Sequence, residues 1–188
     1  MKEYLTVASE TKSELIIKKS VFITRVYPLE TEEEAQCRLE AVRKEEYRAN
    51  HNCYAYVLGD HCSQLKCSDD GEPSGTAGRP ILAVLQHMEL TNLLVIVTRY
   101  FGGVKLGANG LVRAYGQSAS QALAGAAIIK RQPSSLVQFA LDYSFLGKLK
   151  AACGEKGYGI TDTVFADNVL LTAQIPTPEK EAFLARIY

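Results

Sequence analysis

The sequence lacks the long apolar segments of membrane and secreted proteins. No apolar run approaches the roughly 18–20 residues that a membrane-spanning helix needs. The opening residues, Met1 to Leu5, contain no continuous apolar core of a secretory signal. We therefore expect a cytoplasmic protein. With 47% apolar and 22% charged residues, a chain of 188 residues fits one large or two small globular domains, which excludes disorder and collagen-like structure.

The sequence also lacks paired cysteines. No two of its five cysteines have the Cys-x-x-Cys spacing of a redox centre or zinc knuckle, and an odd number cannot all pair, so reduced thiols are the simplest interpretation. The five are Cys37, Cys53, Cys62, Cys67 and Cys153. Soft metal ligands occur within a short stretch, as His51, Cys53, His61, Cys62 and Cys67. Their spacing fits no zinc pattern, so we expect no metal and no cofactor.

Histidine is scarce as well, with three residues in the chain. Neither a nucleophile elbow nor a Cys–His signature is present, so the sequence predicts no catalytic residue. Acidic residues are absent from Leu90 to Leu141, although the whole chain has 21 basic and 21 acidic residues. Five cations give that segment a formal charge of +5, namely Arg99, Lys105, Arg113, Lys130 and Arg131. A local positive face is predicted on a protein without net charge.

Glycines gather around two motifs, and eight of the fourteen lie between Gly71 and Gly116. Residues 69–78 read Asp-Asp-Gly-Glu-Pro-Ser-Gly-Thr-Ala-Gly, and residues 99–107 read Arg-Tyr-Phe-Gly-Gly-Val-Lys-Leu-Gly. Glycine is used where the backbone has a positive φ or lies close to another group. The glycines therefore indicate either contact with a ligand or tight connections between strands and helices.

The first motif carries three carboxylates, Asp69, Asp70 and Glu72, followed by Ser74 and Thr76. Carboxylate oxygens could hold a divalent cation. The same residues suit an acidic turn that is held by its own side-chain hydrogen bonds. We favour the turn.

The second motif resembles an anion site, in which a strand, a glycine-rich loop and a helix N-terminus meet a phosphate. Gly102 and Gly107 have P-loop spacing, but Ala108 and Asn109 stand where that loop needs Lys and Ser/Thr, and the dinucleotide fingerprint is absent too. The candidates for contact with RNA or another anion are Arg79, Arg99, Gly102, Gly103, Lys105, Gly107, Asn109 and Arg113. The neighbouring aromatics, Tyr100, Phe101 and Tyr115, either stack on bases or belong to the core.

Hydrophobic patterns predict an α/β first domain over residues 1–132. A capping box of Thr31 and Glu34 marks the start of its first helix, whose core positions are Ala35, Leu39 and Val42. The other expected elements are a long strand or hairpin over 15–27 bent near 18–20, strands at 53–58, 64–67, 93–98 and 128–130, and helices at 80–88 and 109–126.

Residues 133–188 are predicted to form a second domain after a linker at 133–135. Its pattern is a strand at 136–143, a helix at 145–155 capped by Ser144, two strands around residues 167–168, and a helix from Pro178. A ferredoxin-like fold has the order βαββαβ, so we expect the natural protein to have one more C-terminal strand. The fold class is therefore α+β.

The two glycine-rich motifs, together with the segment His-Asn-Cys-Tyr-Ala-Tyr at residues 51–56, closely resemble those of the IMPACT (YigZ-like) family. The resemblance implies a first domain similar to domain 2 of ribosomal protein S5 and to the fourth domain of elongation factor G. It implies a ferredoxin-like second domain similar to the fifth domain of that factor. Such modules sit on ribosomal or other structured RNA. Eukaryotic members regulate translation with an additional RWD domain that this chain lacks, so their protein partner is not carried over.

These observations lead us to expect a noncatalytic, RNA- or ribosome-associated regulator of translation. One alternative is an enzyme or binder acting on a phosphorylated small molecule, which a deep pocket joining Asp69, Glu72, Arg99 and Lys105 would favour. Another is a protein–protein interaction module that uses an open sheet edge of the second domain.

Overall fold

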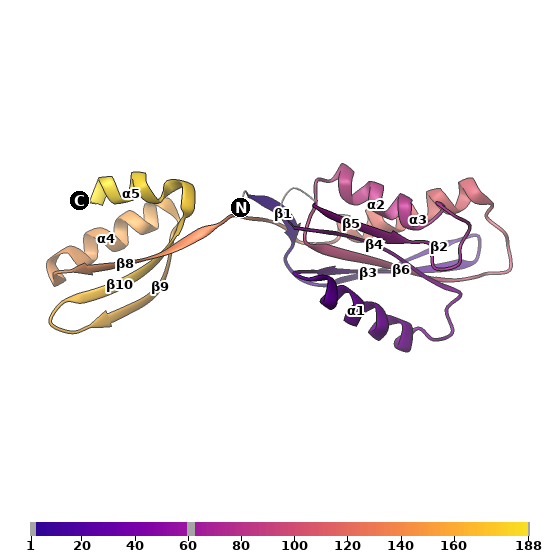
Figure 1. Ribbon diagram of the computed structural model, residues 1–188, viewed down its shortest axis with the longest axis horizontal. Coiled ribbons are helices and arrows are strands. Elements are labelled where there is room, and N and C mark those ends of the chain that lie inside the picture. Colours follow the sequence, from indigo (N-terminus) through magenta and orange to yellow (C-terminus); the bar gives the residue numbers. More distant parts are fainter. Residues whose placement is uncertain (1–2, 60–62, 188) are drawn as a thin grey trace. The chain divides into compact units, whose positions relative to one another are not determined.

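The computed structural model describes residues 3–59 and 63–187. It divides into a first unit, Tyr4–Arg131, and a second unit formed mainly by the residues from Gln132 onward (Figure 1). None of the described helices is both long enough and apolar enough to cross a membrane.

A five-stranded antiparallel sheet forms the middle of the first unit, with the strand order β2-β3-β6-β4-β5. The strands are β2 (Thr11–Ile17), β3 (Ser20–Pro28), β6 (Leu93–Tyr100), β4 (His51–Leu58) and β5 (Gln64–Ser68). The central strand β6 is buried at every residue except Tyr100. This confirms the prediction from its uninterrupted apolar run that both of its faces would be covered.

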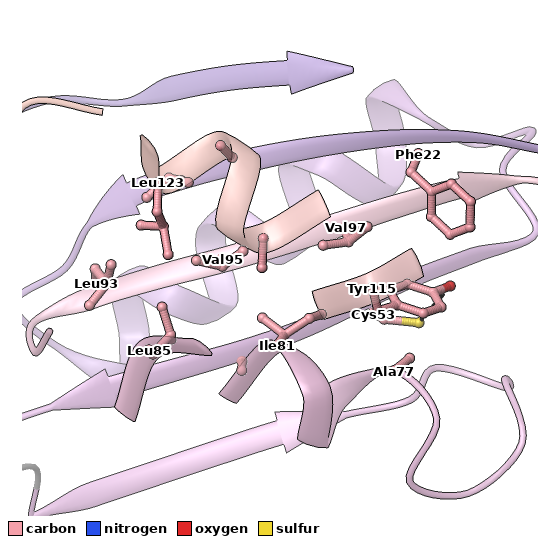
Figure 2. Packing of buried hydrophobic residues seen from close by; sticks show 14 of the residues in the cluster. Phe22, Cys53, Ala77, Ile81, Leu85, Leu93, Val95, Val97, Tyr115 and Leu123 are labelled. Atoms are coloured by element: carbon pink, nitrogen blue, oxygen red, sulfur yellow. Dashed lines mark hydrogen bonds between the residues drawn. The ribbon is translucent and has the colours of Figure 1, made fainter. Parts of the chain in front are cut away.

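Helices cover both faces of this sheet (Figure 1). Helix α1 (Glu32–Glu45) packs its Ala35, Leu39 and Val42 on one face, as predicted. Helices α2 (Gly78–His87) and α3 (Ala108–Ala124) pack on the other. Figure 2 shows that second cluster, in which side chains of both helices meet those of β6. Helix α2 begins two residues before the predicted start at Pro80.

Two local sequence signals produce the structures expected of them. The chain bends between β2 and β3 at Lys18 and Lys19, whose φ values of 46° and 69° are those of a two-residue hairpin turn. Thr31 caps α1 by accepting the N–H of Glu34 at 3.2 Å. The Glu34 carboxylate accepts the N–H of Glu30 at 2.9 Å instead of that of Thr31, so the capping box is shifted by one residue.

A two-stranded sheet completes the first unit. Strand β7 (Ile128–Arg131), which was predicted, pairs antiparallel with β1 (Tyr4–Val7), which was not. The pairing ties the beginning of the unit to its end.

The second unit has the order βαββα and a three-stranded antiparallel sheet, β8-β10-β9. Its elements are β8 (Ser134–Leu141), α4 (Tyr143–Lys156), β9 (Gly159–Phe165), β10 (Val169–Pro176), a 3-10 turn (Thr177–Glu179) and α5 (Lys180–Ile187). This is a ferredoxin-like arrangement, as expected. The predicted cap Ser144 is wrong: Asp142 caps α4 by accepting the N–H of Ser144 at 2.9 Å. The additional C-terminal strand stays a prediction.

Candidate functional site

The first glycine-rich motif forms the connection between β5 and α2, and Asp69 holds it together. The Asp69 carboxylate accepts three backbone N–H groups, from Gly75 at 2.8 Å, Ala77 at 3.0 Å and Gly78 at 2.9 Å. Burial alone would raise the pKa of Asp69, but these three hydrogen bonds outweigh it and the pKa is lowered. The interpretation of this segment as a self-bonded acidic turn is confirmed.

Replacement of Asp69 by asparagine is expected to lower the free energy of unfolding by about 1–3 kcal/mol at neutral pH, because an amide offers one acceptor oxygen and no charge. The lowered pKa makes the carboxylate's contribution complete above its unfolded-state pKa of about 3.9, and it is lost as the pH falls through the folded-state pKa. Urea unfolding of both proteins at neutral pH and near pH 3 measures this. The difference should shrink at the lower pH; a constant difference would contradict the argument.

The rest of this motif docks on neighbouring elements. The Asp70 carboxylate accepts the N–H of Asn52 at 2.6 Å and pairs with Arg43 at 3.0 Å. The Asp70 carbonyl oxygen lies 2.9 Å from Nδ1 of His51. Thr76 donates its hydroxyl to the carbonyl of Pro73 at 2.6 Å. Ser74 and Arg79, by contrast, are exposed to solvent.

A buried polar network joins the two glycine-rich motifs. Glu72, with 3% of its side chain exposed, accepts a hydrogen bond from Nη1 of Arg99 at 2.7 Å and another from the hydroxyl of Tyr115 at 2.8 Å, both at Oε1. The Cys53 thiol lies 3.3 Å from that hydroxyl and donates to the carbonyl of Asp69 at 2.9 Å. Figure 2 shows the Cys53 and Tyr115 side chains next to each other.

The structure corrects the role that the sequence analysis gave to Arg99. We expected Arg99 among the solvent-facing anion contacts, but its side chain is 7% exposed and its charge is compensated by Glu72. Ser20 also accepts from Arg99, at 3.4 Å. In the expected pocket, Glu72 and Arg99 are buried together. Lys105, which was expected to join them, is exposed to solvent instead.

The same burial keeps the network's thiol and phenol protonated. Desolvation raises the pKa of Cys53 to about 12; the hydrogen bond with Tyr115 acts to lower it, and the nearby carboxylates of Glu72, Asp70 and Asp69 act to raise it. Desolvation also raises the pKa of Tyr115 far above its ordinary value. A thiol that stays neutral at physiological pH is a poor nucleophile, so these groups hold the structure in place.

Glycines of the second motif have two different roles. A Cβ on Gly102 would lie 2.0 Å from the carbonyl carbon and oxygen of Lys19, so glycine is needed for close approach to the β2–β3 turn. Gly103 and Gly107 have φ values of +83° and +73°, and a Cβ there would meet nothing within 4 Å. The tight-connection interpretation thus explains Gly102, while Gly103 and Gly107 lie on an open surface.

Exposed cations and two exposed apolar side chains lie in the segments that meet at Gly102, namely the β2–β3 turn and the loop and helix start that follow β6. We call this set the basic face, and it consists of Lys18, Lys19, Phe101, Val104, Lys105 and Arg113. Asn109 is exposed at the start of α3. Of the three candidate aromatics, Tyr115 belongs to the core and Tyr100 donates its hydroxyl to Glu46 at 2.6 Å, which leaves Phe101 on the surface.

Sequence reasoning missed the contribution of Lys18 and Lys19. The contact between Lys19 and Gly102 depends on the pairing of β3 with β6, in which Val21 lies opposite Tyr100. A Lys-Lys pair at a predicted hairpin bend is the signal that could have placed two cations at one end of the sheet. Lys130 and Arg131, counted in the acid-free segment, lie instead on β7.

Within the described residues, no group of three or more His, Cys, Asp or Glu side chains is arranged to hold a metal ion. His61 and Cys62, two of the soft ligands noted in the sequence, lie outside the described part of the chain.

The sheet, its helices on both faces and the βαββα unit that follows define a two-domain α+β protein whose second domain is ferredoxin-like. The sequence model of the Impact N-terminal domain matches residues 18–123, and a domain of unknown function, DUF1949, matches residues 139–187. The chain belongs to the IMPACT family, which confirms the resemblance seen in its motifs.

Relatives match over most of the chain. It is 39% identical over 180 residues to the IMPACT family member YvyE of Bacillus subtilis, covering 96% of this chain and 83% of the relative. It is 37% identical over 173 residues to YigZ of Escherichia coli, covering 91% and 85%. A crystal structure of a protein described as hypothetical has a TM-score of 0.70 and 35% identity, covering 100% of this chain and 92% of its own.

Proposed function

We propose that this protein is a noncatalytic regulator of translation that contacts structured RNA or the ribosome through the basic face. The observation that carries the proposal is the meeting of two distant segments in one place. The turn at Lys18 and Lys19 lies against the loop that leads to Lys105 and Arg113. A patch of cations on a protein without net charge provides a local site for a polyanion.

Acidic groups near this end of the sheet are already paired, which supports the proposal. Asp70 is bound by Arg43, and Glu46 is bound by Arg25. Glu72 is buried against Arg99. Each of these carboxylates has a cationic partner within the protein, although Arg25 is shared between Glu46 and Glu45. Their negative charge therefore weakens the attraction of a polyanion to the exposed lysines less than that of unpaired carboxylates would.

Binding to ribosomes and to structured RNA across a salt series tests this function. The variant Lys105→Gln/Arg113→Gln removes two cations of the face. We expect binding at moderate salt to weaken about tenfold or more, and the slope of log K against log salt to fall by about 1.4–1.8, which is 0.7–0.9 for each lost contact. Arg99 stays unchanged, because its replacement would disturb the core.

The matched control is Lys148→Gln/Lys150→Gln, which removes the same charge from exposed positions on α4. It should bind almost as the unaltered protein does. Absence of binding at low salt, or equal losses in the two variants, would contradict the proposed function.

The phosphorylated small molecule has less support from the geometry than RNA has. That alternative required Lys105 to join Glu72 and Arg99 in one pocket, whereas the two buried residues neutralise each other and Lys105 faces solvent. Strand pairing at a sheet edge of the second unit stays a prediction.

A further inference from the structure

We infer that the basic face binds single-stranded RNA, with an unpaired base stacked on the ring of Phe101. The inference rests on the proposed function and names the form of RNA that the face selects. Three observations support it: the contacts that hold the Phe101 ring at the surface, the residues next to the ring, and the lack of exposed base faces in an RNA duplex.

Phe101 is presented to solvent by a rigid support. It directly follows β6, is 47% exposed, and its N–H donates to Oδ1 of Asn50 at 2.8 Å. The guanidinium of Arg99 lies 5.6 Å from the centre of the ring, and Arg99 is itself fixed by Glu72. A large apolar side chain is thus kept at the surface by an exposed backbone hydrogen bond and by its contact with Arg99, which is itself held in a buried pair. The ring therefore needs little further ordering before a base can stack on it.

Exposed lysines and accessible backbone lie in the segments next to this ring. The backbone carbonyl of Lys19 contacts Gly102, which follows Phe101, and Lys105 is exposed four residues after Phe101. Between them, Gly103 leaves the backbone uncovered. An aromatic ring beside lysines is the combination found where a protein follows a nucleic-acid backbone and stacks its bases.

A duplex would use only part of this face. In A-form RNA the bases are stacked inside the helix and the major groove is too deep and narrow for side chains, so proteins contact phosphates and 2′-hydroxyls. The lysines could make such contacts, but the ring of Phe101 would find no base. An acidic peptide would likewise engage the cations and leave the π-face of the ring without a partner.

The absence of tryptophan allows a direct test. Phe101→Trp introduces a single tryptophan at the proposed stacking position. Its fluorescence should be quenched by a single-stranded RNA of about 12 nucleotides and not by the corresponding duplex. The control is Phe145→Trp on α4, where the native ring is 56% exposed and lies 5.5 Å from Nζ of Lys148. The tryptophan of this control should not respond to either RNA.

Affinity measurements supply the second readout. Phe101→Leu keeps an apolar side chain but removes the π-face, so single-strand affinity should fall about 5-fold to 100-fold while the salt slope stays the same. Duplex affinity should not change, and Phe145→Leu should have no effect. Circular dichroism of Phe101→Leu and Phe145→Leu serves to verify that both variants fold.

Three other results would contradict the stacking inference, the proposed function, or both. If RNA binds but does so equally in single-stranded and duplex form and independently of Phe101, the stacking inference is wrong and the proposed function stands. If polyglutamate competes as well as RNA at equal charge, the face recognises polyanions in general and the inference is also wrong. If the unaltered protein binds neither RNA nor ribosomes, both proposals fail.

Discussion

Replacement of Arg99 by methionine is expected to lower the free energy of unfolding of the first unit by about 3–5 kcal/mol. The change removes the guanidinium from Glu72, whose side chain is 3% exposed and keeps the hydroxyl of Tyr115 as a hydrogen-bond donor, with Nε2 of His51 at 3.9 Å from Oε2. An uncompensated charge in the interior costs more than the pair itself contributes, because its hydration is not replaced. Urea unfolding followed by far-UV circular dichroism measures the loss.

Arg43→Met provides the matched control. Arg43 pairs with Asp70 at 3.0 Å, close to the 2.7 Å of the buried pair, but its side chain is 49% exposed. That replacement should cost less than about 1 kcal/mol. The double variant Glu72→Gln/Arg99→Met should cost clearly less than the sum of the single changes, because neither residue leaves a charge behind. Equal costs for the buried and exposed arginines would show that burial does not govern this pair.

Gly102→Ala is expected to cost at least about 3 kcal/mol, at the upper end of the range for overpacked sites. The new methyl group would lie 2.0 Å from the carbonyl carbon and oxygen of Lys19 and 2.4 Å from the nitrogen of Ser20. These are backbone atoms, so the whole turn between β2 and β3 must move. That movement would also disturb the hydrogen bond from the Gly102 N–H to Oγ of Ser20, which is 3.3 Å long.

The neighbouring residue separates crowding from backbone strain. Gly103 has a φ of +83° and free space where a Cβ would lie, so Gly103→Ala should cost about 1–2 kcal/mol through the left-handed conformation alone. Thermal and urea unfolding of the two variants should therefore place Gly102→Ala well below Gly103→Ala in stability. The reverse order would mean that the close approach of the loop to the turn is not a stabilising contact.

Much of the fold follows from local sequence signals. The apolar run in β6, the capping residue Thr31 and the bend at Lys18 and Lys19 each act through neighbouring residues, and each structure follows its prediction. The sequence signal is weaker where two neighbouring residues are both suitable helix caps. Asp142 and not Ser144 caps α4: the Asp142 carboxylate accepts both the N–H and the hydroxyl of Ser144, so the helix already begins at Tyr143.

The site was less predictable, because its arrangement depends on contacts between distant segments. Arg99 and Glu72 are separated by 27 residues, and they meet because β4 pairs with β6 and the loop that carries Glu72 docks on β4 through Asp70. The contact between Gly102 and Lys19 likewise depends on β3 lying beside β6. Sequence reasoning therefore identified the motif residues but could not separate Arg99, which is buried, from Lys105 and Arg113, which face solvent.

A single carboxylate oxygen of Glu72 accepts hydrogen bonds from both Arg99 and Tyr115, so the loop, β6 and α3 meet at one atom. The consequence is a constraint on how the sequence can diverge. Loss of any one of the three side chains leaves the other two poorly matched, so substitutions at these positions must occur together or be followed quickly by compensation. The two glycine-rich motifs thus form one inherited unit, and grafting either of them alone onto another protein would separate it from the residues that hold its shape.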